Sequence, residues 1–306
     1  MKQSGEIEVK GGRLIYQMNR DHVEIESCRV MEPVLEIPDR IEDFWVTKVA
    51  KKAVLSNKAL RELVLPQNIT EVGDWAFAHC TNLQKVWMPR KNIRFGKGVF
   101  KECKNLLRIY CKEQEDEKMA GLLSMVPVML DAEYLLAPIE AGEKEWLEKL
   151  DARLVTLLQR ADEDGYLKQV LCGEEDLMAS LEIYLANRRR EKSSLCFARL
   201  CNHIGLKDDL KQYLQKYLRE NTKGCEYEPA WEVILKEHPQ DIEYYRILAD
   251  AGGITTENFQ KLIEDMGENY PENHFLKFQF QGLKPNHFFW KIPKSPMADY
   301  SLMQAA

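Results

Sequence analysis

Two aromatic residues in the first third of the sequence have the types and spacing of a protein contact surface. Trp87 and Tyr110 are 23 residues apart, and each follows a cationic residue two positions earlier, Lys85 and Arg108. Val64 stands another 23 residues before Trp87. Tryptophan, tyrosine and arginine are enriched among the residues that dominate binding at protein interfaces. The chemistry that these side chains indicate is recognition of a partner.

Other residues carry reactive groups but lack the spacing of a catalytic or metal site. His79 with Cys80, and Cys201 with His203, combine an imidazole and a thiol. Zinc sites use paired ligands at short fixed spacings, and no second pair accompanies either of these. Residues 96–98, Gly-Lys-Gly, lack the remaining pattern of a phosphate-binding loop. We therefore expect no catalytic residue, no metal site and no cofactor.

The contact residues belong to a repeat of 23 residues that extends over residues 46–112. Apolar residues recur in five columns, with one member of each column in every repeat. The columns are Val49, Val72 and Phe95; Val54, Phe77 and Phe100; Leu60, Leu83 and Leu106; Leu63, Val86 and Ile109; and Leu65, Met88 and Cys111. A period of this length is typical of a solenoid, in which each repeat buries its apolar face against its neighbours.

Alternation along the strands of such a solenoid predicts which side chains point outward. Successive side chains on a strand point to opposite faces, so the residues between the inward leucine and valine positions face out. The outward columns are Val64, Trp87 and Tyr110, and Glu62, Lys85 and Arg108. We call these six residues the strand face. Two interpretations stay open: this face binds an external protein, or the helical domain packs over it and uses the aromatic residues as an internal contact.

Segments before the repeat complete the solenoid. Residues 12–27 hold two short apolar runs separated by Asn-Arg-Asp, which predicts a hairpin that caps the open end of the stack. Residues 34–41 predict a first, degenerate coil, because Leu35-x-Ile37-Pro38 has the pattern of Leu63-x-Leu65-Pro66.

The repeat resembles the BspA-type leucine-rich repeat family, most clearly over residues 69–89, where Ile-x-x-Val, Ala-Phe, Cys, Leu and Val-x-Met-Pro follow in register. The resemblance covers roughly residues 34–112. Asn57 stands in place of the usual Cys, Val99 in place of Ala and Lys112 in place of Pro. The resemblance implies a short β-solenoid with parallel strands on one face, used by relatives for protein or surface binding. Many of those relatives are secreted adhesins.

Helical spacing replaces strand spacing after Lys112, and we place a domain boundary there. Trp146, Leu150, Leu154 and Leu157 share one helical face. The expected helices cover residues 143–161, 175–190, 194–205, 208–218, 229–238, 242–253 and 255–266. The predicted fold class is α+β: a capping hairpin and solenoid at 1–112, an all-α domain at 113–281, and an extended or disordered tail at 282–306.

Charge divides the sequence into a basic and an acidic part. Residues 1–112 have 20 Lys and Arg against 14 Asp and Glu, whereas residues 113–306 have 23 against 35. The positive excess lies mainly between Arg90 and Lys112. A second cluster, Arg188-Arg189-Arg190 with Lys192, is expected to be a solvated stretch near a helix C-terminus, where the dipole favours cations. The acidic neighbour favours internal charge pairing, so we do not expect nucleic acid as a partner.

The sequence also predicts a compartment. Its apolar runs are shorter than the roughly 20 residues that span a bilayer, and its N-terminus lacks the apolar core of a secretory signal. We expect a cytoplasmic protein with no membrane partner and eight reduced cysteines. Cys80 and Cys103 occupy the same repeat position, so a disulfide between them is conceivable, but a reducing compartment argues against it.

These observations favour a protein–protein interaction or scaffold module. We expect Trp87, Tyr110, Val64, Lys85 and Arg108 to bind a protein partner that the sequence does not identify. The alternative is an enzyme of unknown class with a site in the helical domain or in the cleft between the domains.

Overall fold

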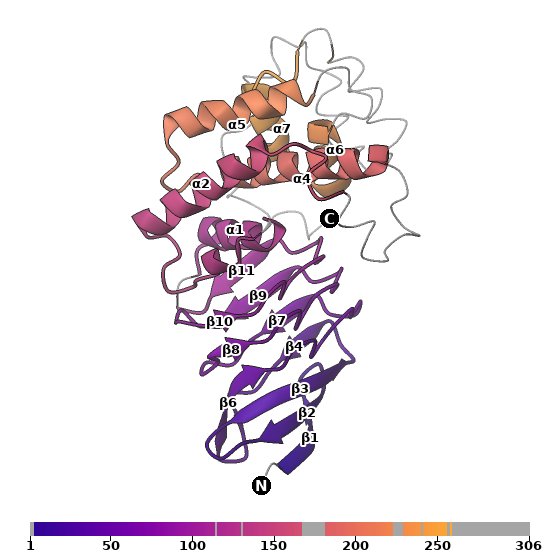
Figure 1. Ribbon diagram of the computed structural model, residues 1–306, viewed down its shortest axis with the longest axis vertical. Coiled ribbons are helices and arrows are strands. Elements are labelled where there is room, and N and C mark those ends of the chain that lie inside the picture. The colour runs from indigo at the N-terminus through magenta and orange to yellow at the C-terminus, as the bar shows by residue number, and fades with distance from the viewer. Residues whose placement is uncertain are drawn as a thin grey trace, which may run out of the picture. The chain divides into compact units, whose positions relative to one another are not determined.

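The computed structural model describes residues 3–113, 115–129, 131–166, 181–222, 229–239, 241–255 and 258. The chain divides into two compact units, Met1–Arg160 with Asn202–Leu206, and Ala161–Cys201 with Lys207–Ala306. The predicted fold class is confirmed: a β-solenoid is followed by helices (Figure 1). Strands give way to helices after residue 112, while the first unit continues to Arg160. The boundary at residue 112 therefore stays a prediction.

An antiparallel meander forms the N-terminal end of the solenoid. It consists of β1 (Gln3–Val9), β2 (Gly12–Met18) and β3 (Val23–Val30). The strands β2 and β3 are the predicted hairpin. No strand is predicted at β1, because Ile7 and Val9 are its only strongly apolar residues. Parallel pairing of β3 with β6 (Phe44–Val49) joins the meander to the coils.

Each coil contributes one strand to each of two sheets. One sheet has the order β1-β2-β3-β6-β8-β10, with β5 (Arg40–Ile41) paired to β6, and includes β8 (Glu71–Val72) and β10 (Arg94–Phe95). The other has the order β11-β9-β7-β4 and consists of β4 (Val34–Glu36), β7 (Glu62–Val64), β9 (Lys85–Met88) and β11 (Arg108–Cys111). Figure 1 shows these four strands stacked in sequence order. The predicted first coil is confirmed by the pairing of Leu35 with Leu63.

The predicted apolar columns form the core between the two sheets. Leu63, Val86 and Ile109 are all 0% exposed, and the other column residues are buried with one exception. Phe95 is half-buried, because it lies in β10, the last strand of its sheet, and has no further coil beside it. The 23-residue period therefore predicts the core correctly except at the end of the stack.

The turns between the two sheets use left-handed backbone at two positions per repeat. Left-handed φ values are rare for residues other than glycine, so their recurrence at the 23-residue period reflects the coil geometry. These positions are Lys52 (φ 59°), Trp75 (φ 53°) and Gly98 (φ 60°), and Ser56, His79 and Glu102, each at φ 58°. Hydrogen bonds between coils hold this conformation, including Trp75 N–H to Lys97 O at 2.9 Å.

Helices and short turns follow the last coil within the first unit. The helix α1 (Glu117–Met125) begins at Asp116, whose side chain accepts a hydrogen bond from Met119 N at 2.6 Å, and it packs against β11. Two 3-10 turns, η1 (Val126–Val128) and η2 (Glu133–Leu135), lead to α2 (Lys144–Gln159). The predicted apolar face of α2 is buried, and Trp146 is 1% exposed.

The second unit contains α4 (Leu181–Cys201), α5 (Asp208–Glu220), α6 (Pro229–Glu237) and α7 (Ile242–Asp250). The helix α4 packs against the other three. The predicted break between residues 190 and 194 is wrong, because no proline or glycine interrupts the chain there and α4 continues through it. The predicted helix at 255–266 and the tail at 282–306 lie outside the described residues, apart from positions 255 and 258. No helix among the described residues has both the length and the apolar content to cross a membrane.

Candidate functional site

The structure brings the five predicted binding residues together on the sheet formed by β4, β7, β9 and β11. Parallel pairing places Val64 beside Trp87, and Trp87 beside Tyr110. The same register places Lys85 beside Arg108. The side chains of one column are therefore neighbours along the solenoid, although the residues are 23 positions apart in the sequence.

Trp87 is held by Tyr110 of its own column and by Glu62 of the charged column. Its ring stacks on the ring of Tyr110, with centroids 4.3 Å apart and planes inclined by 16°. Its indole Nε1–H donates a hydrogen bond to Glu62 Oε1 at 2.8 Å. The side chain is half-buried, so part of the indole stays accessible while its orientation is fixed. Such a preorganised aromatic group loses little conformational freedom when a partner binds.

Tyr110 does not lie in an exposed position. It is 6% exposed, and its hydroxyl donates a hydrogen bond to Glu117 Oε1 at 2.7 Å. Burial, together with this carboxylate, raises the pKa of Tyr110 to about 12. The predicted exposure of Tyr110 is wrong, because α1 starts soon after β11 and packs against it. For this residue the internal-contact interpretation holds.

The charged column of the strand face is only partly neutralised. Arg108 Nε lies 3.1 Å from Glu117 Oε2, and Arg108 is half-buried. The hydrogen bond from Tyr110 and the charge of Arg108 lower the pKa of Glu117. Lys85 is exposed and forms no ion pair with any residue that the structure describes. Five of the six strand-face residues are therefore at least partly accessible, and Tyr110 is the buried one.

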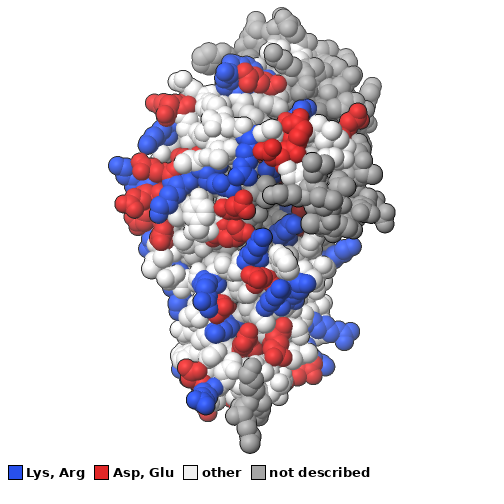
Figure 2. Space-filling model, viewed as in Figure 1, with Lys and Arg blue, Asp and Glu red and all other residues white. Residues whose placement is uncertain are grey.

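The basic stretch between residues 90 and 112 is partly paired within the first unit, where four of its eight Lys and Arg residues form ion pairs. Its ion pairs join Arg90 to Glu143 (3.6 Å), Arg94 to Glu71 (2.5 Å), Lys104 to Glu102 (3.4 Å) and Arg108 to Glu117 (3.1 Å). Lys112 Nζ donates to Leu65 O at 2.7 Å. Figure 2 shows positive and negative side chains interspersed on the visible face. The sequence favoured such pairing over a nucleic-acid surface, and the absence of a nucleic-acid partner stays a prediction.

The cysteines of the repeat have a structural role. Cys80 Sγ–H donates to Val54 O and Cys103 Sγ–H donates to Phe77 O, both at 3.1 Å. Burial raises the pKa of Cys80 to about 11 and that of Cys103 to about 12, so both stay thiols at neutral pH. Both are free cysteines. In the preceding coil Asn57 takes this place, and its side-chain oxygen accepts hydrogen bonds from two backbone N–H groups of the turn.

The histidines that accompany cysteines in the sequence do not form a common site with them. His79 is exposed in a left-handed turn position, while Cys80 is buried beneath it. His203 Nε2 lies 3.0 Å from Lys118 Nζ. Within the described ranges, no group of three or more His, Cys, Asp or Glu side chains is arranged to hold a metal ion.

The repeat also contains a column of asparagines that the apolar pattern does not predict. Asn82 Nδ2–H donates to Lys58 O at 2.7 Å, and Asn105 Nδ2–H donates to Thr81 O at 2.8 Å. The two residues are 23 positions apart, so the period could have revealed them. These bonds form a polar ladder that joins successive coils and that the apolar columns do not reveal.

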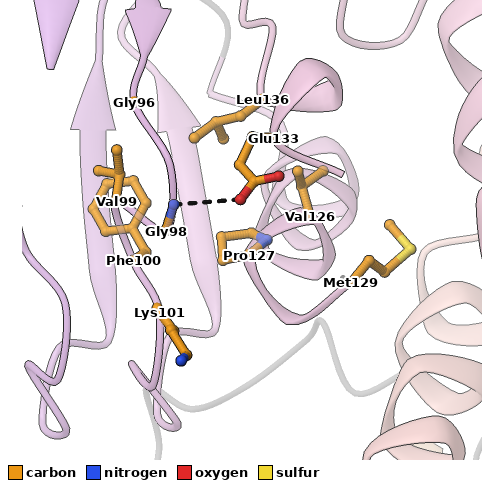
Figure 3. A pocket seen from close by; sticks show the side chains of 10 residues that line it. All are labelled: Gly96, Gly98, Val99, Phe100, Lys101, Val126, Pro127, Met129, Glu133 and Leu136. Atoms are coloured by element: carbon orange, nitrogen blue, oxygen red, sulfur yellow. Dashed lines mark hydrogen bonds between the residues drawn. The ribbon is translucent and has the colours of Figure 1, made fainter. Parts of the chain in front are cut away.

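A small pocket lies where the last coil meets η1 and η2 (Figure 3). Gly98 N–H donates to Glu133 Oε1 at 3.3 Å, whereas in the preceding coil Trp75 N–H donates to Lys97 O. The carboxylate of Glu133 therefore replaces the carbonyl group that a further coil would supply. The pocket has a volume of about 30 Å³, far below the roughly 300 Å³ of a typical ligand site. It adds no support to the enzyme alternative, which stays a prediction.

Comparison with known families agrees with the repeat. Residues 37–118 match the model of the BspA type leucine rich repeat region, in six copies. The resemblance to this family is thereby confirmed for the solenoid. No curated protein matches the chain.

Solved structures of bacterial leucine-rich repeat proteins are similar to part of the chain. A leucine rich cell surface protein from Faecalibacterium prausnitzii is 20% identical with a TM-score of 0.31, and the match covers 35% of this chain and 30% of that one. A leucine-rich repeat protein from Bacteroides capillosus is 18% identical (TM-score 0.30; 33% and 78% covered). The T. pallidum leucine rich repeat protein is 23% identical (TM-score 0.29; 35% and 50% covered). The chain thus spans under a third of the first structure's length, and the similarity concerns the repeat fold alone.

Proposed function

We propose that the protein is an interaction or scaffold module whose strand face binds a protein partner. The observation that carries this proposal is the fixed, half-buried indole of Trp87 beside the exposed ammonium group of Lys85. An aromatic group with a nearby cation is typical of the positions that dominate binding at interfaces. Tyr110 orients Trp87 by stacking on its ring. Tyr110 and Arg108 also anchor α1, because both contact Glu117 in its first turn.

The repeat supports the same proposal. Solenoids of this type present an extended, rigid surface, and leucine-rich repeat folds are generally used for protein or surface binding. Rigidity matters because ordering a mobile side chain on binding costs about 0.5–1.5 kcal/mol. Trp87 has already lost that freedom in the unbound protein. A cytoplasmic location is part of the proposal. It is supported by Cys80 and Cys103, whose thiols donate hydrogen bonds to backbone carbonyls and so suit a reducing compartment.

Affinity capture with a matched pair of charge reversals tests the proposal. Lys85→Glu changes the strand face, and Lys58→Glu makes the same change at an exposed lysine in the turn between the sheets. Each tagged protein is incubated with an extract of the cells that produce it, and the captured proteins are quantified by mass spectrometry. We expect Lys85→Glu to reduce capture of the principal partner by about tenfold or more, and Lys58→Glu to leave it unchanged. Equal capture by wild type and both variants would contradict the proposal.

A further inference from the structure

We propose that the solenoid has a second binding surface, in the turns between its two sheets, which takes an acidic protein segment. The surface consists of Trp75, Lys51, Lys52, Lys97 and Lys101, and we call it the turn-side patch. All four lysines are exposed and Trp75 is half-buried. The patch is separate from the strand face, and this inference does not depend on the function proposed for that face.

The period places the five residues in the equivalent turns of three successive coils. Lys51 Nζ lies 5.0 Å and Lys52 Nζ 5.2 Å from the ring centroid of Trp75. In the next coil, a Cβ atom on Gly98 would lie 2.7 Å from Trp75 Cδ1 and 3.4 Å from Lys101 Cβ, so the indole rests directly on this turn.

Lys97 completes the patch through its backbone. Its carbonyl oxygen accepts the N–H of Trp75 at 2.9 Å, which fixes the turn of one coil against the next. Two coils therefore contribute lysines, and the coil between them contributes the indole. Asp74 stands between Lys51 and Lys97 at the same repeat position, and its Oδ1 accepts the backbone N–H of Lys97 at 2.8 Å. Neighbouring coils are about 4.8 Å apart, so the patch extends roughly 10 Å along the solenoid.

The patch lacks the partners that neutralise other cations of the solenoid. Among the residues that the structure describes, none of the four lysines forms an ion pair, whereas Lys48 and Arg94 both contact Glu71. Figure 3 shows the side chain of Lys101 pointing away from Glu133, whose carboxylate accepts the N–H of Gly98.

The indole N–H of Trp75 is also without an acceptor in the described part of the chain, in contrast to Trp87, whose N–H is bonded to Glu62. A tryptophan N–H is a donor only, and an ammonium group has three donors and no acceptor. The patch therefore offers hydrogen-bond donors and positive charge to whatever binds it.

The chemistry favours an acidic protein segment over a nucleic acid. Lysine ammonium groups lie over the indole, so a base would have to displace them in order to stack on it. Leu55, which is 41% exposed, occupies the repeat position of Lys101 two coils earlier. An apolar side chain at the edge of a basic patch suits a segment that mixes carboxylates with apolar residues, and an extended segment of three or four residues covers about 10 Å.

Fluorescence anisotropy with a defined probe tests the inference. The probe is a fluorescein-labelled peptide in which glutamate alternates with leucine, and the comparison peptide has glutamine in place of glutamate. The test variant combines Lys51→Gln, Lys52→Gln, Lys97→Gln and Lys101→Gln. The control variant removes the same charge from exposed lysines elsewhere and combines Lys10→Gln, Lys149→Gln, Lys216→Gln and Lys236→Gln.

We expect the wild type to bind the acidic peptide more weakly as salt is added. The test variant should raise the Kd by about tenfold or more, and the control variant by less than about twofold. Thermal unfolding checks that both variants are folded. If the fourfold test variant is not, the pairs Lys51→Gln with Lys52→Gln and Lys97→Gln with Lys101→Gln replace it.

Four results would overturn the inference. In the wild type, these are no binding of the acidic peptide at about 1 mM or equal affinity for the glutamine peptide. The others are an equal rise in Kd in the test and control variants, and tighter binding of an oligothymidylate with the same dependence on the four lysines. The last result would assign the patch to nucleic acid instead.

Discussion

Two tryptophans on opposite sides of one coil show how differently the same repeat uses an aromatic residue. Trp87, on the strand face, is stacked on Tyr110 and bonded to Glu62. Trp75, in the turn, lies beneath the ammonium groups of Lys51 and Lys52 and keeps its N–H without an acceptor in the described chain. The period therefore determines the direction in which a side chain points. The neighbouring side chains determine which of its hydrogen-bonding groups and how much of its ring a partner can reach.

The largest expected effect is a difference in the free energy of unfolding between alanine variants of the two tryptophans. Trp87→Ala removes the stack on Tyr110 and leaves the carboxylate of Glu62 without its donor, so we expect a loss of about 3 kcal/mol in the free energy of unfolding. Trp75→Ala should cost about 1 kcal/mol, since it removes a half-buried ring without a protein hydrogen bond. Denaturant unfolding of the two variants measures both losses. Equal losses would contradict the distinction between the two faces.

A smaller effect tests the close approach of Trp75 to the next coil. Gly98→Ala adds a Cβ atom 2.7 Å from Trp75 Cδ1 at a φ of 60°, and we expect a loss of about 2 kcal/mol. Gly98→Asn is the matched variant, because asparagine tolerates left-handed backbone better than alanine but has the same Cβ atom. Similar losses in the two variants indicate that the contact with the indole dominates. A neutral Gly98→Ala would show that Trp75 does not rest on this turn.

The contact between Tyr110 and α1 should contribute about 1 kcal/mol. Tyr110→Phe removes the hydroxyl that donates to Glu117 and leaves the ring stack in place. The pKa of Glu117 is lowered in the folded protein, so its contribution is present above its unfolded pKa of about 4.3 and is lost as the pH falls through the lower, folded value. The difference in unfolding free energy between wild type and Tyr110→Phe should therefore shrink below about pH 4.

A difference that does not depend on pH would show that the hydroxyl contributes through another contact. Denaturant unfolding at several pH values between about 3 and 7 measures this dependence. Tyr134→Phe, at a tyrosine that is 61% exposed, is the matched control and should change stability little at any pH.

The smallest effect concerns the left-handed turn positions. His79→Gly relieves the unfavourable φ of 58° at an exposed residue, at the expense of a more flexible unfolded chain, and we expect a net gain of about 0.5 kcal/mol. Thr81→Gly, two positions later, has no such strain to relieve and should destabilise the protein. A loss of stability in both variants would show that the left-handed position is not strained.

The sequence predicted the solenoid well because its period places each apolar residue in a known column. Leu63, Val86 and Ile109 are fully buried as expected. Prediction failed where the period ends: Phe95 lacks a further coil, and Tyr110 is covered by α1, whose position the repeat does not encode. The polar partners were not predictable from single columns either, since Glu62 and Glu117 act on residues 25 and 7 positions away.

The helical unit was predicted less accurately because its elements do not repeat. Arg188, Arg189 and Arg190 were expected near a helix C-terminus, but they lie inside α4. There, Asp162 contacts Arg189 and the buried Lys192, both at 2.7 Å. Burial would raise the pKa of Asp162, but these two cations outweigh burial and lower it. Such long-range ion pairs leave no periodic signal in the sequence.

Site-specific photo-crosslinking tests the central claim, that the strand face of the solenoid holds a protein partner. A photoreactive amino acid replaces Lys85 on the strand face in one variant and Lys216 in α5 in another, both at exposed positions. After irradiation in the cells that produce the protein, the account predicts a specific adduct for position 85 and none for position 216. An adduct at position 216 without one at position 85 would contradict it.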